Sequence, residues 1–433
     1  MQFKQYPSYK NSGVEWLGDV PEHWGVNRLG VHFKNRKEKV SDKDFKPLSV
    51  TKHGIVPQLE HAAKSDNGDN RKLVRKGDYV INSRSDRKGS SGLADLDGSV
   101  SLINIVLTPF KTIHPKFSHY LLRSYLFQEE FYKYGHGIVA DLWTTNYEDM
   151  RNIHLALPSV SEQTQISNFL EQETTRIDNL IAKQEKLIEL LEEQRKSIIS
   201  HAVTKGLNPN APMKDGGVEW LGEVPEHWMT PSSKHLLEIP ITDGPHETPN
   251  FVDDGVPFIS AEAISKGKID FDKKRGYITP ELNAIYSKKY SPKIEDIYMV
   301  KSGATTGKVA MVETTETFNI WSPLAVFRCN KNKVLPKFLL AVFNSSHFYD
   351  ALVLNWSYGT QQNIGMGVLS NIEIPCPPLK EQAEIIQHLD VQNTKFDKLI
   401  DTQSQLIEKL KEYRSSIISH AVTGKIDVRE FSA

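Results

Sequence analysis

Three short segments of the chain carry side chains whose types suit contact with nucleic acid. The first, NSRSDRKGSS at residues 82–91, places Arg84, Arg87 and Lys88 among small hydroxyl residues after a strand-like run. Arginine can bind guanine through two hydrogen bonds, and lysine and serine suit phosphate groups. A solvated basic loop has the same composition, so this segment alone does not establish a function.

The other two segments lie in the second half of the chain. Gln361, Gln362 and Asn363 in YGTQQN have the amide side chains that bind adenine through two hydrogen bonds. His246 and Thr248 in DGPHETP either contact nucleic acid or cap a turn. An ordinary polar turn is the alternative for both segments.

No arrangement typical of an enzyme active site is present in the sequence. GATTGK at 303–308 has three residues between its glycines and Val309 after the lysine, whereas a phosphate-binding loop needs four and then Ser or Thr. No Gly-x-Gly-x-x-Gly motif opens a βαβ unit, which argues against a site for S-adenosylmethionine. No His/Cys cluster has the spacing of metal ligands. We therefore expect neither catalysis nor a cofactor in this chain.

Length and composition set wider limits. The 433 residues have room for two to four domains, and the hydrophobic (39%) and charged (25%) fractions are those of a soluble globular protein. The N-terminus lacks the apolar core of a signal peptide, and no apolar run is long enough to span a membrane. Cys329 and Cys376 fit no zinc or redox spacing, so we expect reduced thiols in a cytoplasmic protein. Because the net charge is −1, any nucleic-acid surface must be a local patch.

Two repeats organise the chain. GVEWLGDVPEHW at 13–24 recurs as GVEWLGEVPEHW at 217–228, and residues 162–204 align with 381–423 at 23 identical positions of 43. Along the chain the first phrase comes near the start, and the first long repeat is followed by the second phrase. The second long repeat lies near the end and is not followed by a phrase. We therefore expect the two termini to lie together and to rebuild the junction that residues 198–228 form. Trp16, Trp24, Trp220 and Trp228 are expected to hold these junctions to the bases of helices.

Both long repeats predict helices, because apolar residues recur every seven positions. A rod with one apolar stripe needs a partner, and we expect the two helices to pair antiparallel. Gln184 and Gln403 then meet near the middle of the seam and bond each other, or their amides reach solvent. The residues expected to pair the helices are Leu170, Ile177, Leu180, Gln184, Leu187, Leu191, Ile198, Leu389, Phe396, Leu399, Gln403, Leu406, Leu410 and Ile417.

The predicted fold is α+β, with two globular α/β-type modules separated by two long antiparallel coiled-coil helices in circular pseudo-two-fold symmetry. The expected boundaries are a junction repeat at 1–24, a first module at 25–157, a central helix at 158–204, a junction repeat at 205–228, a second module at 229–376, and a second helix with its tail at 377–433.

This order of phrases resembles the specificity subunit of Type I restriction–modification systems. GVEWLGxVPEHW after a helix ending SIISHAVT, and PxxxEQ at the start of a long helix, carry the resemblance. The second module adds ITDGPHETPNFVDDGVPFIS, KSGATTGKVAMV and YGTQQN, whereas the first departs more, with LSVTKHGIVPQ and GDYVINSRSDRKGSSGLA in the corresponding places. The resemblance implies that each module is a target recognition domain that reads one half of a split DNA site.

From these residues and the resemblance together, we expect the following side chains to contact DNA: Lys52, His53, Ser83, Arg84, Arg87, Lys88, His246, Thr248, Lys301, Ser302, Thr305, Thr306, Lys308, Tyr358, Thr360, Gln361, Gln362 and Asn363. The half-site centres should lie about one helical turn, roughly 10 bp, apart.

The resemblance also implies the partners. These are double-stranded DNA, two modification subunits that methylate adenine with S-adenosylmethionine, and restriction subunits that use ATP and Mg. The helices would dock the modification subunits, with Glu185, Glu189, Glu192, Glu193 and Arg195 as candidate interface residues.

Two other functions fit parts of the sequence. A non-catalytic protein-interaction scaffold with two polypeptide-binding modules is favoured by the near-neutral charge and disfavoured by the shared phrases. A self-sufficient methyltransferase is disfavoured because the chain lacks a cofactor loop.

Overall fold

The computed structural model describes residues 3–60, 68–137, 143–265, 267–355, 357–358 and 362–431. The chain divides into two compact units. Unit 1 comprises Met1–Glu185 with Ser404–Ala433, and unit 2 comprises Lys186–Gln403. Each unit holds one module, one junction and a segment of each long helix. Among the described residues, no helix is both long enough and apolar enough to cross a membrane.

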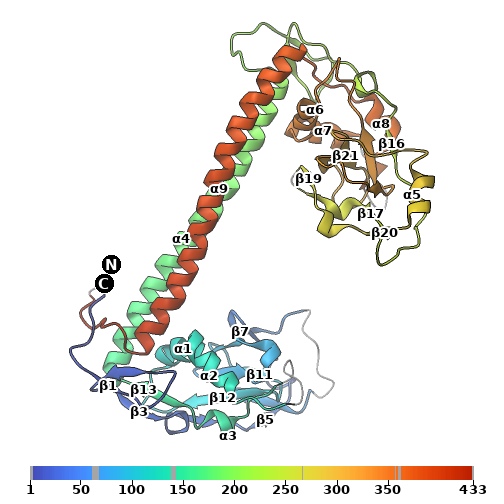
Figure 1. Cartoon of the computed structure of the whole chain (residues 1–433). Helices are drawn as coiled ribbons and strands as arrows, with labels where there is room; N and C mark the ends of the chain where they lie inside the picture. The colour runs from blue at the N-terminus through green and yellow to red at the C-terminus, as the bar shows by residue number, and fades with distance from the viewer. Residues whose placement is uncertain are drawn as a thin grey trace. The chain divides into compact units, whose positions relative to one another are not determined.

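The two long helices are α4 (Val160–Lys205) and α9 (Leu379–Val422). Within each unit their segments lie side by side and run in opposite directions (Figure 1). In unit 1 the Arg414 guanidinium binds Asp178, with Nε 2.8 Å from Oδ1. In unit 2 Arg195 binds Asp397. These ion pairs occupy equivalent positions of the two repeats, and they confirm the antiparallel prediction.

The seam between the helices differs from the predicted one at three leucines. Leu187, Leu399 and Leu406 were expected to pair the helices, but 39%, 46% and 39% of their surface is exposed. The next row of side chains at seven-residue spacing, here called a column, contains Ile407. Ile407 is 6% exposed, and its column faces the partner helix instead. Both columns have steps of three and four residues, so heptad spacing alone does not choose between them. The rejected column also contains Gln194, whose burial would cost desolvation energy.

The predicted bond between Gln184 and Gln403 would join the two units and stays a prediction. The Gln184 carbonyl oxygen is buried and has no hydrogen-bond partner among the described residues.

The described residues of the unit 1 module form small antiparallel sheets and three short α-helices. A four-stranded sheet has the order β10-β9-β12-β4, a three-stranded sheet has the order β11-β8-β5, and β6 pairs with β7 in a hairpin. The strands are β3 (Gly25–Arg28), β4 (Phe33–Asn35), β5 (Lys39–Val40), β6 (Leu48–Thr51), β7 (Gly54–Pro57), β8 (Arg71–Val74), β9 (Tyr79–Asn82), β10 (Ser91–Leu93), β11 (Gly98–Val100), β12 (Asn104–Pro109) and β13 (His154–Leu157). The helices are α1 (Pro115–Arg123), α2 (Tyr125–Lys133) and α3 (Tyr147–Met150).

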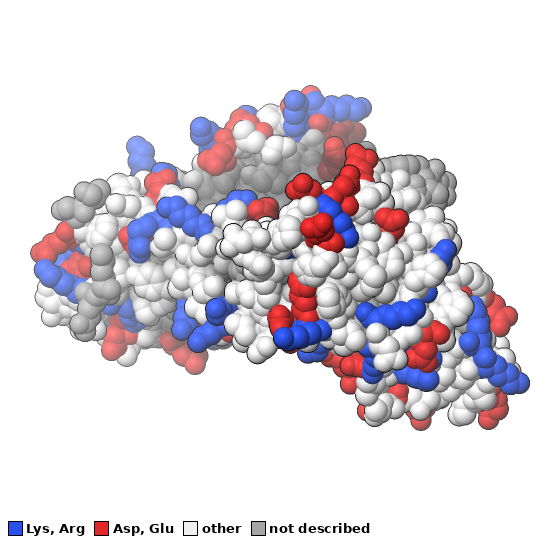
Figure 2. Space-filling model, turned by 90° about the horizontal axis from the view of Figure 1, so that it is seen from above, with Lys and Arg blue, Asp and Glu red and all other residues white. Residues whose placement is uncertain are grey.

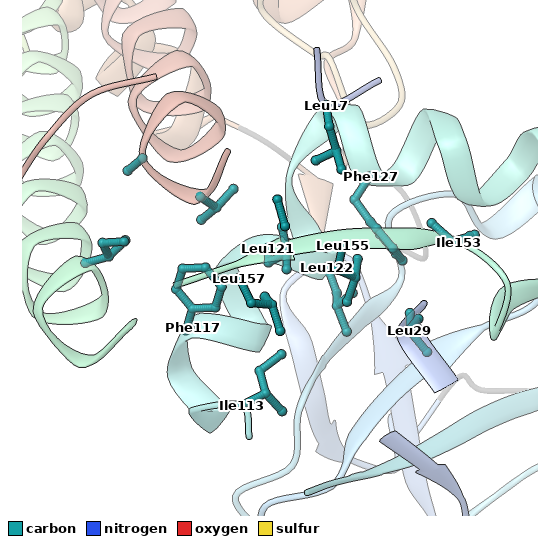
Figure 3. Packing of buried hydrophobic residues seen from close by; sticks show 14 of the residues in the cluster. Leu17, Leu29, Ile113, Phe117, Leu121, Leu122, Phe127, Ile153, Leu155 and Leu157 are labelled. Atoms are coloured by element: carbon teal, nitrogen blue, oxygen red, sulfur yellow. The ribbon is translucent and has the colours of Figure 1, made fainter. Parts of the chain in front are cut away.

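The main core of unit 1 joins the module to the long helices. Phe117 and Leu121 of α1 and Phe127 of α2 are fully buried in it (Figure 3). The same cluster contains Ile166 of α4 and Ile417 of α9. Burial of a large apolar side chain contributes roughly 1.5–3 kcal/mol, so a shared core of this size fixes the module to its helix segments.

The module of unit 2 has the same plan with different details. Its sheets have the orders β16-β24-β21-β22 and β20-β17-β23, and the β17–β23 pair is parallel. The strands are β16 (Thr242–Asp243), β17 (Val256–Ile259), β18 (Ile264–Ser265), β19 (Lys268–Ile269), β20 (Gly276–Ile278), β21 (Ile297–Val300), β22 (Val309–Met311), β23 (Asn319–Ile320), β24 (Leu324–Phe327), β25 (Ser357–Tyr358) and β26 (Gln362–Asn363). The helices are α5 (Pro280–Tyr286), α6 (Pro336–Phe343), α7 (Ser346–Leu354) and α8 (Met366–Asn371).

The repeated twelve-residue phrase forms the same clasp in each unit. In unit 1 the phrase includes β2 (Asp19–Pro21), which pairs with β1 (Tyr9–Asn11). In unit 2 it includes β15 (Glu223–Pro225), which pairs with β14 (Met213–Asp215). The Trp24 indole donates to Glu162 at 3.1 Å, and the Trp228 indole donates to Glu381 at 3.1 Å. Both glutamates lie in the first turn of a long helix.

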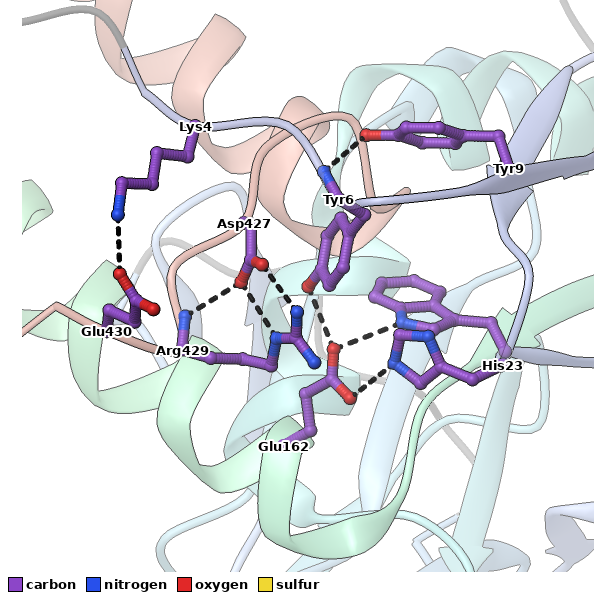
Figure 4. Close-up of polar contacts among 9 residues, drawn as sticks. Lys4, Tyr6, Tyr9, His23, Glu162, Asp427, Arg429 and Glu430 are labelled. Atoms are coloured by element: carbon purple, nitrogen blue, oxygen red, sulfur yellow. Dashed lines mark hydrogen bonds and ion pairs between the residues drawn. The ribbon is translucent and has the colours of Figure 1, made fainter.

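Unit 1 completes its clasp with both ends of the chain (Figure 4). The backbone of Lys4 pairs with that of Asp427, and the Lys4 ammonium lies 2.6 Å from Glu430. Tyr6 donates its hydroxyl to Glu162 at 2.8 Å. The termini therefore meet as the circular order of the repeats predicts, and together they take the place that the central junction has in unit 2.

Candidate nucleic-acid interface

Three sequence segments of the second module meet in unit 2. The loop after β16, the loop after β21 and strand β26 are connected by contacts between their residues. The Lys301 ammonium lies 3.1 Å from the Asp243 carboxylate, which joins the first loop to the second. Ser302 pairs with Asn363 through a backbone bridge, and the Ile364 amide donates to the Lys301 carbonyl at 2.8 Å. Tertiary structure thus assembles residues that lie more than 100 positions apart.

Asp243 is the electrostatic centre of this site. Its side chain is 1% exposed and lies 2.6 Å from Lys289 Nζ, 3.1 Å from Lys301 Nζ and 3.2 Å from His246 Nε2. Burial raises the pKa of Asp243, but its two lysine partners outweigh burial and hold the pKa below the ordinary value. One buried carboxylate therefore orients two lysines and a histidine at the edge of the module. The sequence analysis assigned no role to Asp243, although it is the first residue of the DGPHETP segment.

The loop after Asp243 is seated tightly against β23. A Cβ atom on Gly244 would lie 2.0 Å from the Ile320 carbonyl oxygen, so only glycine fits there. The His246 ring nitrogen Nδ1 lies 3.0 Å from the Ser322 hydroxyl. The loop nevertheless leaves the side chains of His246 and Thr248 exposed. A rigid backbone that presents polar side chains to solvent is suited to reading a ligand.

The residues 301–308 form a turn in which frame and surface positions can be separated. Thr306 is 7% exposed, and its hydroxyl donates to the Gly303 carbonyl at 2.7 Å, so it supports the turn. Lys301 is only 12% exposed. Ser302 and Thr305 are half-buried, and Lys308 is exposed. Of these five predicted contacts, Lys308 has the most accessible side chain.

The YGTQQN segment is described in part. Thr360 and Gln361 lie outside the described residues. Tyr358 and Gln362 lie in the backbone pairing of β25 with β26, and Asn363 has an exposed side chain.

The loop after β9 in unit 1 is built like the loop after β21. The Thr145 amide donates to the Ser83 carbonyl at 3.0 Å, and Arg84 pairs with Thr144 through a backbone bridge. These contacts correspond to those of Ile364 with Lys301 and of Asn363 with Ser302. NSRSDRKGSS and KSGATTGKVA therefore occupy the same place in their modules, as their positions in the sequence predict.

The cations of the first-module loop have acidic neighbours. Arg84 Nε lies 3.0 Å from Asp86, Arg87 Nε lies 3.6 Å from Asp86, and Lys88 pairs with Glu129. Ser83 is 3% exposed and donates its hydroxyl to the Ile103 carbonyl, so it belongs to the frame of the loop.

A groove of about 910 Å³ lies between this loop and the β6–β7 hairpin. Two predicted residues, Lys52 and Arg87, line it. The sequence analysis missed the other polar groups that line it, which include Arg71, Asn82, Ser90, Ser101 and Asn104. Their only sequence signal is their position near strand ends, which many residues share. His53 lies beside Lys52 in the exposed hairpin turn.

On the face shown in Figure 2, the described charged residues do not form one broad basic surface. Lys and Arg side chains are interspersed there with Asp and Glu. Any contact with a polyanion must therefore be made through local groups such as the loops described above.

Comparison with known proteins shows which families and structures this chain is similar to. The model of the "Type I restriction modification DNA specificity domain" family matches residues 225–412. The "Putative type I restriction enzyme MjaX specificity subunit" of Methanocaldococcus jannaschii is 25% identical over 99% of this chain and 99% of its own length. Over nearly its whole length the chain is similar to specificity subunits of type I restriction–modification systems. The predicted resemblance is confirmed.

Further relatives agree with this assignment. The "Type I restriction enzyme MjaVIII specificity subunit" of the same organism is 26% identical over 65% of this chain and 64% of its own length. A solved chain from work on complex assembly and conformational transition of the type I R-M system shares the fold with a TM-score of 0.66 at 18% identity, over 93% of this chain and 98% of that one. The HsdS subunit of Thermoanaerobacter tengcongensis covers 94% of this chain and 98% of its own, with a TM-score of 0.50 at 19% identity.

Proposed function

We propose that this chain is the DNA-recognition subunit of a type I restriction–modification complex, and that each module reads one half of an asymmetric bipartite site. The observation that carries the proposal is the equivalence of the two loops after β9 and β21. They occupy the same structural place on a repeated scaffold but present different side chains. A duplicated frame with unlike reading loops suits recognition of two different half-sites.

The side chains proposed to contact DNA are the predicted ones, ordered by their accessibility. In the second module the exposed His246, Thr248, Lys308 and Asn363 contact bases or phosphates, together with the half-buried Ser302 and Thr305. Lys301 and Thr306 support the loop from beneath. The amides of Gln361 and Gln362 remain proposed adenine contacts.

In the first module, Lys52, His53, Arg84, Arg87 and Lys88 are the proposed contacts, and Ser83 supports their loop. Because Asp86 lies beside both arginines, DNA phosphates must compete with its carboxylate. The groove between loop and hairpin is the proposed position of one DNA strand.

The long helices are proposed to dock two modification subunits. In unit 2, Leu187, Leu190, Val391 and Leu399 are 39–51% exposed on α4 and α9. Apolar side chains in this number on one helix pair are suited to a protein partner. In this proposal the chain is non-catalytic and cytoplasmic, the modification subunits bind S-adenosylmethionine, and the restriction subunits use ATP and Mg.

The proposal is tested by mapping adenine methylation across the genome of cells that express this chain with its modification subunit. We expect a split, asymmetric motif that disappears when the chain is deleted. Replacement of residues 229–376 by the module of another family member should change only one half of the motif. Methylation that is unaltered by the deletion, with no salt-sensitive duplex binding by the purified assembly, would refute the proposal.

A further inference from the structure

Unit 1 contains a polar pocket that is separate from the recognition loops. It has a volume of about 600 Å³ and lies between the β6–β7 hairpin turn, the end of α1 and helix α9. Its lining includes Lys52, His119, Arg123, Lys411 and Arg414. Asp178 is the one acidic residue of the lining. All of these residues belong to unit 1.

Two of the four permanent cations of the pocket lack a carboxylate partner among the described residues. Arg414 binds Asp178 with Nε 2.8 Å from Oδ1, and Lys411 lies 2.8 Å from Glu408. Arg123 instead donates to two backbone carbonyls, those of Ser91 at 2.7 Å and of Lys52. Carbonyl oxygens satisfy its N–H groups but do not neutralise its charge.

The charge of the pocket affects its buried histidine. Burial, together with the positive charges of Arg123 and Arg414, lowers the pKa of His119 to about 4. His119 is therefore neutral at physiological pH. The permanent positive charge of the pocket comes from its lysines and arginines.

The repeat provides an internal comparison for this charge. The equivalent corner of unit 2 retains the interhelical ion pair, as Arg195 with Asp397. Ser345 caps α7 there exactly as Ser124 caps α2, which fixes the correspondence of the two modules. At the positions of Lys411, Arg123 and His119, unit 2 has Glu192, Asn344 and Leu340. The corresponding corner of unit 2 therefore folds with an acidic, a neutral and an apolar residue at these places.

The pocket adjoins the groove of the first module. Lys52 lines both of them, from the hairpin turn that separates the two. A strand that lies in the groove and crosses the hairpin turn would reach the pocket. An oxyanion such as phosphate is the ligand that uncompensated lysine and arginine side chains favour.

We propose that this pocket binds a backbone phosphate of the DNA strand that leaves the groove. Through this contact unit 1 holds DNA beside helix α9 without reading its sequence. The inference rests on the proposed function, because it assumes that the groove holds DNA. It adds a contact that belongs to the first unit alone.

The test uses the full chain in complex with its modification subunit, and measures duplex affinity between 50 and 200 mM salt. Lys411→Gln removes one pocket cation, and Lys409→Gln is the matched control, because Lys409 is an exposed lysine of α9 outside the pocket lining. Loss of one phosphate contact should reduce the slope of log affinity against log salt by about 0.9. When the salt concentration rises from 50 to 200 mM, the duplex affinity of the wild-type complex should fall about 3.5-fold more than that of the Lys411→Gln complex. The effect should be equal on a specific and a scrambled duplex, because a phosphate contact carries no sequence information.

The other outcomes separate the alternatives. An unchanged slope for Lys411→Gln overturns the proposal. If inorganic phosphate then binds the wild-type complex more tightly than the variant, the pocket holds a free oxyanion. If the variant instead loses affinity for the modification subunit, the pocket binds an acidic protein group. If the wild-type complex itself shows no salt-dependent duplex binding, the proposed function fails before the pocket is tested.

Discussion

The clasp at the base of α4 allows one stability prediction to be worked out in detail. Glu162 is buried, and its carboxylate accepts hydrogen bonds from Tyr6 at 2.8 Å and Trp24 at 3.1 Å, and contacts His23 at 2.9 Å. Its counterpart Glu381 has one buried donor, Trp228, besides a half-exposed histidine. The two repeats therefore differ by one buried hydroxyl and by the exposure of the glutamate side chain, which is 7% for Glu162 and 26% for Glu381.

Substitution of each glutamate by alanine should have unequal costs. A buried donor left without an acceptor costs about 1–3 kcal/mol, taken as about 2. Glu162→Ala leaves Tyr6 and Trp24 unsatisfied and should reduce the free energy of unfolding by about 4 kcal/mol. Glu381→Ala should cost about 2 kcal/mol, because the half-exposed histidines can bind water in either unit. In a Tyr6→Phe background, Glu162→Ala should also cost only about 2 kcal/mol.

Scanning calorimetry of the full chain measures these differences. For domains of this size, 1 kcal/mol corresponds to a shift in Tm of about 2–4 °C, so Glu162→Ala should lower the transition of unit 1 by about 8–16 °C. Glu185→Gln, at an exposed position of α4, is the control and should shift it little. Equal shifts for the two alanine variants, or no effect of Tyr6→Phe on the cost of Glu162→Ala, would refute the reasoning.

Three further predictions concern single residues. Asp243→Asn removes the negative charge that pairs with Lys301. In methylation mapping it should relax only the half of the motif that the second module reads. Relaxation of both halves would contradict the placement of Asp243 in the second module's site. Gly244→Ala places a Cβ 2.0 Å from the Ile320 oxygen and should destabilise unit 2 by about 2 kcal/mol or more in urea unfolding, whereas a neutral effect would show that the loop can move. The pKa of His119 is lowered to about 4 in the folded chain, so its contribution to stability is complete above pH 6.5 and is lost as pH falls from 6.5 to 4. This contribution amounts to about 3 kcal/mol. The variant His119→Leu should therefore flatten the pH dependence of the unfolding free energy between pH 4 and 6.5.

The sequence predicted the features that depend on local pattern. Apolar residues at heptad spacing predicted both long helices, because a helix is specified by side chains three and four positions apart. The repeated phrase predicted equal junctions, since near-identical segments in equal surroundings make the same contacts. The Trp24–Glu162 and Trp228–Glu381 bonds are of this kind.

Features that depend on packing between distant segments were not accessible in this way. The structure buries Ile407, which is 6% exposed, and leaves Leu406 39% exposed, and this difference between neighbouring positions depends on how the helix segments pack. Both columns fit the local period equally well.

The recognition loops show the same division. From sequence alone, DGPH, KSGATTGK and YGTQQN were three separate polar segments typical of turns. Tertiary structure placed Asp243 against Lys301, 58 positions away, and the hairpin carbonyl of Lys52 against Arg123, 71 positions away. Such contacts are decided by sheet order and by the burial of charge with its partners, which no short window of sequence contains. The sequence by itself determined the repeated frame, and the tertiary structure decided which polar residues of the loops are buried as supports and which side chains are exposed.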